Sequence, residues 1–125
     1  MLKHALAVII AIALAGPPPA VRAQTQMTLD ESLQRLSEIL GALHYLRSIC
    51  GSNEGAKWRT EMQALIDAEA SAADRRAKMI AGFNRGYNGF QQTYRTCTPA
   101  AETSIRRYLE EGAKIAREVT ARFAN

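Results

Sequence analysis

Few residues in this chain of 125 are of types that could do chemistry, and their spacing limits the reactions to consider. His44 is the one histidine outside the apolar N-terminal segment, and it lies beside a helical pattern of leucines. The sequence has no His-Glu-x-x-His motif and no group of cysteines and histidines at the spacing of zinc sites. A lone histidine in such a place is typical of a structural hydrogen bond. We therefore expect no metal, no cofactor and no catalytic residue.

Carboxylates are the remaining candidates for catalysis. Asp67, Glu69 and Asp74 are close together in the sequence, and glycoside hydrolysis needs only two acids about 5 to 9 Å apart. Acids at the junction of two helices are, however, usually solvated or capping. The pattern favours a protein without enzymatic activity and leaves an envelope hydrolase as a third interpretation.

The N-terminus has the three parts of a signal peptide. Lys3 and His4 form a short polar start, residues 5–15 are apolar, and Val21-Arg22-Ala23 is a small-x-small cleavage site. A helix over the apolar run would cover roughly 17 Å of the roughly 30 Å hydrocarbon core of a membrane. We therefore expect cleavage of residues 1–23. The remaining domain, residues 24–125, would have no transmembrane span and would be periplasmic or secreted.

The charge of the chain argues against one class of partner. The full sequence has a formal net charge of +4, and the loss of Lys3 and Arg22 with the signal peptide would lower it by two. The remaining basic residues are scattered, with short clusters such as Arg106-Arg107 at spacings that suit solvated helix faces. So weak a positive bias predicts no nucleic acid partner.

Cys50 and Cys97 are expected to form a disulfide, because two cysteines in an exported chain usually pair; the alternative is two buried thiols. No Cys-x-x-Cys motif suggests a redox role. The bond would also decide the topology. One continuous helix from Glu54 to Thr96 would be about 65 Å long, whereas bonded cysteines have α-carbons within about 7 Å. The chain must therefore reverse near residues 71–74, so that the first and third helices run parallel and end together.

Helical periodicity accounts for nearly all of residues 28–123, and no window alternates as a strand does. We predict an all-α fold, a small up-and-down bundle of four helices with one disulfide. The first helix should begin at Thr28 in a capping box with Glu31. Ser52 or Asn53 should cap the second helix, the third should run from about Ala72 to Cys97, and Thr98-Pro99 should start the fourth.

The third helix has three stripes of different character. An aromatic stripe, expected to face the core, comprises Phe83, Tyr87, Phe90 and Tyr94 together with Ile80 and Cys97. A glycine stripe should let another helix approach closely, with the fourth helix as the expected neighbour, and comprises Gly82, Gly86 and Gly89. An amide-rich stripe is either solvated or a candidate partner-binding surface, and comprises Asn84, Asn88, Gln91 and Arg95.

Several short motifs resemble those of an uncharacterised family of small exported alphaproteobacterial proteins, a domain of unknown function. The resemblance covers about Thr28 to Phe123 and rests on the segment 43–50, Trp58-Arg59-x-x-Met62, the segment 83–87 and Tyr94-x-x-Cys97. It implies export and a shared fold. It transfers no activity and no catalytic residue.

Two functions follow from these patterns besides the envelope hydrolase. The first is an exported interaction or envelope-maintenance protein that binds an envelope protein, a peptide or a glycan. The second is a disulfide-clamped periplasmic chaperone, which the small, helical, exported domain suggests. The mild basicity of the chain argues against a chaperone that depends on the titration of many acids.

Overall fold

The protein is an all-α bundle in the computed structural model, which describes residues 16 and 27–123. Helices α1 (Leu29–Ile49), α2 (Lys57–Glu69), α3 (Ala73–Thr93) and α4 (Pro99–Phe123) follow one another, and this part of the chain contains no strand. The predicted four-helix fold is confirmed. The expected signal peptide lies almost wholly outside the described residues.

Helix α1 begins as its sequence predicts. The backbone N–H of Glu31 donates to Thr28 Oγ1 over 3.2 Å, and the backbone N–H of Thr28 donates to Glu31 Oε2 over 2.7 Å. This capping box satisfies two backbone donors at the helix start. Beyond the other end, Gly51 adopts a φ of +77°, a left-handed conformation that glycine accepts without strain.

The start of α2 differs from the prediction. Its N-cap is Ala56, and no side chain caps the helix. Ser52 instead donates from its hydroxyl to the carbonyl of Arg47 over 2.7 Å, so it closes α1 and does not open α2. The predicted cap of α2 is therefore wrong, because the Ser52 hydroxyl is engaged by a carbonyl in the last turn of α1.

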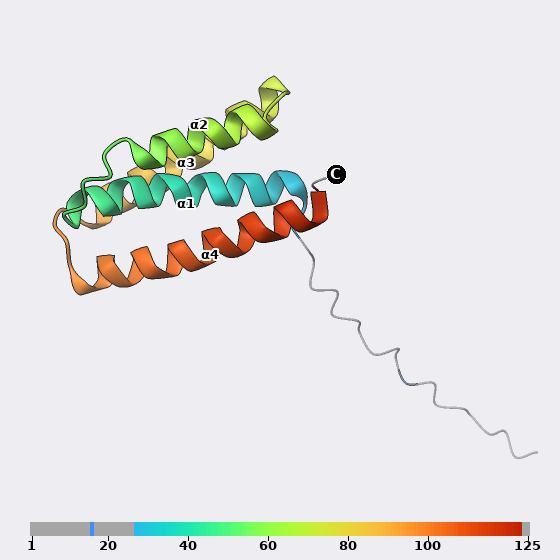
Figure 1. Ribbon diagram of the computed structural model, residues 1–125. Helices are drawn as coiled ribbons and strands as arrows, with labels where there is room; N and C mark the ends of the chain where they lie inside the picture. Colours follow the sequence, from blue (N-terminus) through green and yellow to red (C-terminus); the bar gives the residue numbers. More distant parts are fainter. Residues whose placement is uncertain (1–15, 17–26, 124–125) are drawn as a thin grey trace, which may run out of the picture.

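Helix α1 is the centre of the bundle, and each of the other helices packs on it (Figure 1). In that view α2 lies above α1, α4 below it and α3 behind it, and successive helices run in opposite directions. Leu33, Ile39 and Leu46 of α1 are completely buried. Trp58, Met62 and Ile66 pack on it from α2, and Ile105 and Ile115 from α4.

The closest helix pair is α1 with α3, and glycines make their approach possible. A Cβ atom on Gly86 would lie 2.0 Å from the carbonyl oxygen of Glu38, and one on Gly41 would lie 1.9 Å from the carbonyl oxygen of Phe83. Both contacts are with backbone, which cannot yield as a side chain can. Gly82 and Gly86 therefore allow close approach as predicted, but Gly89 faces open space, and the helix that packs against the stripe is α1 and not α4.

The buried line of α3 also differs from the prediction. Met79, Gly82 and Gly86 are its buried residues, whereas Ile80 is 38% exposed. The aromatic side chains are half-buried and border this line where they pack against the core; they are Phe83, Tyr87, Phe90 and Tyr94. Because the two backbones meet at the glycines, the large rings can lie only beside the contact.

The third helix ends four residues earlier than predicted. Its last residue is Thr93, and Tyr94 is extended at φ −121° and ψ 123°. The hydroxyl of Tyr45 on α1 donates to the carbonyl of Tyr94 and so fixes the turn. The chain then reaches the predicted disulfide, with the α-carbons of Cys50 and Cys97 4.8 Å apart. The reversal before α3, at residues 70–72, is also where the disulfide requires it.

Helix α4 begins with the capping pair expected from the sequence. The backbone N–H of Ala101 donates to Thr98 Oγ1 over 3.1 Å, and Pro99 is the first helical residue. Proline loses nothing there, since its position has no helical partner for an N–H.

Candidate functional site

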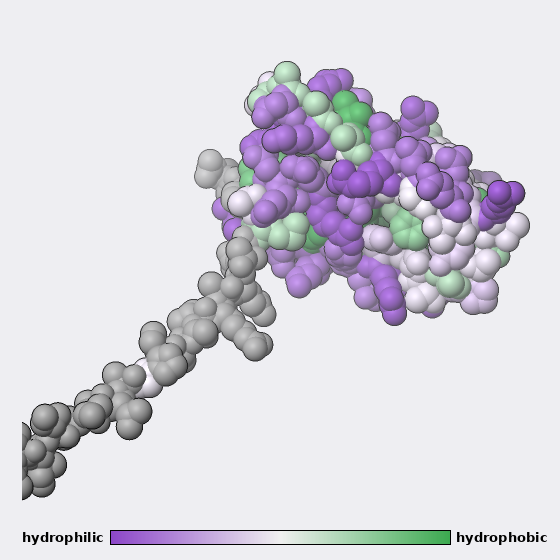
Figure 2. Space-filling model, turned by 180° about the vertical axis from the view of Figure 1, so that it is seen from behind, coloured by the Kyte–Doolittle hydropathy of each residue, from purple (hydrophilic) through white to green (hydrophobic). Residues whose placement is uncertain are grey.

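The amide-rich residues of α3 form an exposed polar face. Asn84, Asn88 and Gln91 are all exposed, and none makes a side-chain hydrogen bond to another of the described residues. Steps of four and three residues place them on one side of the helix. Their amides are therefore free to donate to and accept from a partner. Figure 2 shows the molecule from the side of α3, and the surface there is largely hydrophilic.

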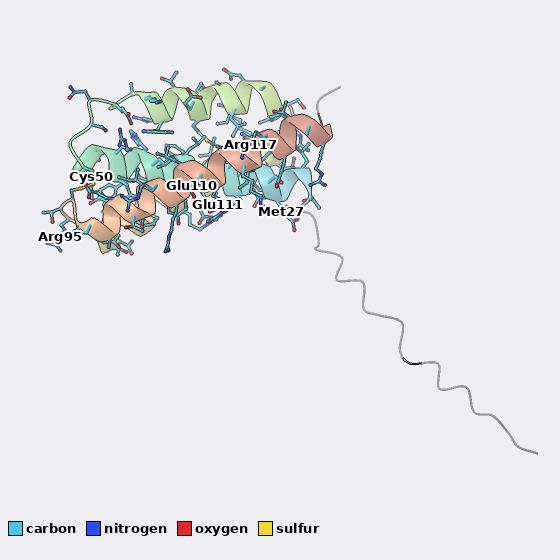
Figure 3. All side chains as sticks on the ribbon, turned by 60° about the horizontal axis from the view of Figure 1, so that its bottom comes forward. Met27, Cys50, Arg95, Glu110, Glu111 and Arg117 are labelled. Atoms are coloured by element: carbon cyan, nitrogen blue, oxygen red, sulfur yellow. A yellow bond between two sulfur atoms is a disulfide. The ribbon has the colours of Figure 1, made fainter. Side chains whose placement is uncertain are left out.

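Arg95, the fourth residue of the predicted stripe, does not continue it. It is exposed, but it follows the extended residue Tyr94 and lies in the connection to α4. Figure 3 shows it at the end of the bundle where Cys50 lies. The structure thus groups three of the four predicted residues on α3 and places Arg95 beyond the end of that helix.

A groove that the sequence did not indicate runs along the opposite side of α1. Its floor is formed by α1 and its walls by α2 and α4, with a volume of about 430 Å³. The floor comprises Leu36, Ile39, Leu40 and Leu43. These side chains point away from Gly41 and Glu38, where α3 packs, because they lie on the other side of α1. The groove and the polar face of α3 therefore open in opposite directions.

Half of the residues that form the walls of this groove are alanine or glycine. Ala64 and Ala68 contribute from α2, and Gly112, Ala113 and Ala116 contribute from α4. Leu109 stands at the rim and is 42% exposed. The sequence signal for the groove was a second apolar stripe on α4, next to the inward stripe that contains Ile105 and Ile115. Tyr108, one residue before Leu109, instead packs toward the core, with its ring centroid 5.4 Å from that of Phe90.

An ion-pair network joins α1 to the helices on either side of it. Arg35 donates to both carboxylate oxygens of Glu111 on α4, over 2.7 and 2.9 Å, and to Glu38 over 3.1 Å. Glu38 also accepts from Arg85 of α3 over 3.4 Å. The hydrogen bond with Glu111 raises the pKa of Arg35 above its already high ordinary value. These links fix α4 on its side away from the groove.

A second ion pair fixes the start of α2 beside the disulfide. Arg47 donates to both oxygens of Glu54 over 2.9 and 2.8 Å, and the indole N–H of Trp58 donates to Glu54 over 3.1 Å. The hydrogen bonds from Arg47, followed by that from Trp58, lower the pKa of Glu54 to about 2. Trp58 is thereby held in the groove wall with a defined orientation.

His44 packs against the aromatic residues of α3. Its ring centroid is 5.9 Å from that of Phe83 and 5.4 Å from that of Tyr87. Its Nδ1 atom is buried and makes no hydrogen bond. Burial lowers the pKa of His44 below its ordinary 6.5, and the positive charge of Arg59 lowers it further. The imidazole is therefore a neutral packing group at pH 7.

The acids considered for hydrolysis do not converge on a groove of their own. Asp67 accepts a hydrogen bond from Gln63 of the same helix over 2.8 Å. Asp74 is exposed in the first turn of α3, and the backbone carbonyl of Glu69 accepts from Arg75. These contacts are those of solvated residues at a helix junction. Among residues 16 and 27–123, no cluster of acids, cysteines and histidines could hold a metal ion.

Comparison with known proteins places the chain in a family. No curated protein and no solved structure matches it. None of the helices among the described residues is long and apolar enough to cross a membrane. A family model described as a protein of unknown function, DUF2385, matches residues 28–123, the whole span of the four helices. The chain therefore belongs to the DUF2385 family.

Proposed function

We propose that this protein is an exported interaction protein of the bacterial envelope, periplasmic or secreted, that binds its partner without catalysing a reaction. The signal-type N-terminus of the sequence supports export, and so does the disulfide, since such bonds persist in oxidising compartments. The partner is an envelope protein, a peptide or a glycan.

The observation that carries this proposal is the exposed amide face of α3. Asn84, Asn88 and Gln91 offer both donors and acceptors and have no partner among the described residues. They stand on a helix that is held against α1 by backbone contacts at Gly41 and Gly86. A rigid helix presents such groups at fixed spacing, so little conformational entropy is lost on binding.

A comparison of three proteins tests this surface. The wild type, an Asn84→Ala/Asn88→Ala/Gln91→Ala variant and a matched Thr60→Ala/Gln63→Ala/Asp67→Ala variant on the exposed face of α2 would each be used to capture partners from envelope extract. We expect the α3 variant to lose the partner that the wild type retains, and the α2 variant to keep it. Equal capture by all three, at unchanged thermal stability, would reject the α3 face as the binding surface.

A chaperone is the second candidate, because the apolar groove could hold an unfolded segment if acid widened it. The two depressed pKa values favour such an acid response. His44 stays neutral in the fold, so the unfolded chain takes up a proton first as the pH falls below about 6.5. Glu54 stays ionised in the fold until about pH 2, although its ordinary pKa is 4.5. In both cases the unfolded state binds more protons, and stability falls with falling pH.

We expect the urea midpoint of unfolding to decrease in two stages between pH 7 and pH 2. A His44→Gln variant should lose the first stage, whatever its midpoint at pH 7, and a Glu54→Gln variant should lose the second. The binding of a hydrophobic dye, followed over the same range, then separates the two functions. A chaperone requires dye binding to rise as the pH falls, and a flat dye signal would exclude that role.

A further inference from the structure

The side of α4 that faces the groove has a helix-pairing pattern of its own. Leu109, Ala113, Ala116 and Thr120 follow one another at steps of four, three and four residues, the spacing of a coiled-coil seam. All four are exposed, and Leu109 alone exposes 42% of its surface. This seam is separate from the stripe that contains Ile105 and Ile115, which α4 already buries against α1.

Two charged residues border this seam and lack partners. Glu110 and Arg117 are exposed, and neither forms an ion pair with another described residue. They are two helical turns apart, so they lie on the same edge of α4, on which Figure 3 labels them. Two other charges of α4 are already engaged, as Lys114 lies 3.9 Å from Glu118 and Glu111 binds Arg35.

We propose that the groove between α2 and α4 is the interface of a symmetric dimer, in which α4 of a second copy of this chain lies antiparallel against α4 of the first. In an antiparallel pair related by a twofold axis, residue numbers increase along one helix in the direction in which they decrease along the other. An axis midway between Glu110 and Arg117 brings Glu110 of each copy against Arg117 of the other. The dimer would therefore contain two ion pairs between Glu110 and Arg117, one on each side of the axis.

The same register packs the apolar seam. It places Leu109 of one copy between Ala116 and Thr120 of the other, and it places Ala113 against its symmetry-related neighbours. Small side chains allow two helices to approach closely, with Leu109 as the one large side chain that fills a hollow. On the far side, the second α4 meets the groove wall formed by Ala64 and Ala68 of α2.

A second copy fits this surface better than an unrelated apolar ligand, because the patch is complementary to itself. It contains both a protruding leucine and the small residues that receive one, and both members of an ion pair in the correct antiparallel order. A ligand such as an acyl chain would provide no ion-pair partner for Glu110 or Arg117. The dimer also leaves the amide face of α3 free, since that face lies on the opposite side of α1.

Sedimentation of residues 24–125 over a range of protein concentrations tests this interface, with four variants. Glu110→Arg and Arg117→Glu should each raise the dissociation constant about tenfold or more, because each places like charges together twice. The double variant Glu110→Arg/Arg117→Glu restores opposite charges and should restore the dimer. Arg76→Glu, a charge reversal on the exposed surface of α3, should leave the dissociation constant unchanged.

Three outcomes would overturn the proposal: a wild type that stays monomeric at all accessible concentrations, a dimer that survives both single reversals, or a double variant that fails to recover. Circular dichroism of each variant would show that the charge changes leave the helices intact. The readout is association and not partner capture, so its failure is distinguishable from failure of the α3 binding surface.

Discussion

Replacing both Cys50 and Cys97 by alanine should lower the free energy of unfolding by about 4 kcal/mol, the value expected for a disulfide that closes a loop of this length. The bond spans a sequence separation of 47 residues and joins the end of α1 to the segment between α3 and α4. Without it, the unfolded chain gains the entropy of an open loop. Domains of this size are stable by only about 5 to 15 kcal/mol, so the loss is a large share of the total.

Urea denaturation followed by circular dichroism would measure this change. Wild-type protein treated with a reductant provides the matched control, and it should show the same loss without any substitution. At low urea the variant should keep its helices, because α1 buries its leucines with or without the bond. A decrease below about 1 kcal/mol would mean that the disulfide constrains the unfolded chain far less than the loop model requires.

Substitution of Gly86 by alanine should lower the free energy of unfolding by about 2 to 3 kcal/mol, because overpacking forces the backbones apart. The added Cβ would lie 2.0 Å from the carbonyl oxygen of Glu38. Helix α3 would have to move away from α1 along its whole contact. That movement would also loosen His44, whose ring lies between the two helices.

Gly89→Ala is the matched control, one turn further along the same helix. Nothing lies within 4 Å of a Cβ atom at that position. Alanine is favoured over glycine in a helix by about 1 kcal/mol, so this variant should be as stable as the wild type or more stable. Thermal unfolding of the two variants and the wild type would compare their stabilities directly. If both shift in the same direction, the close backbone contact of α1 with α3 is not a determinant of stability.

The sequence was sufficient for the features that depend on local physical chemistry. The capping box of Thr28 and Glu31 and the Thr98-Pro99 start of α4 involve atoms only a few residues apart, and both are present as predicted. The disulfide also made one long-range feature predictable. Because it joins Cys50 to Cys97, the chain has to reverse its direction between α2 and α3.

Candidate site residues could be predicted as exposed polar groups, but not in their final arrangement. The spacing of Asn84, Asn88 and Gln91 follows from the period of the helix, and all three are exposed. Arg95 fits the same period, yet the helix ends at Thr93. The hydroxyl of Tyr45, 49 residues away in the sequence, holds the carbonyl of Tyr94. No local pattern contains that contact.

The sequence by itself determined the four helices and the caps that open α1 and α4, because these depend on neighbours within one or two turns, and it determined the disulfide because the chain has only two cysteines. Only the tertiary structure decided which helix meets which. The sequence alone allowed Gly86 to face α4, but in the structure it packs against α1, which carries Gly41, and that pairing displaces the aromatic residues to its borders. With α3 on one side of α1, α2 and α4 are left apart on the other. The groove and the exposure of Leu109 result from this packing arrangement.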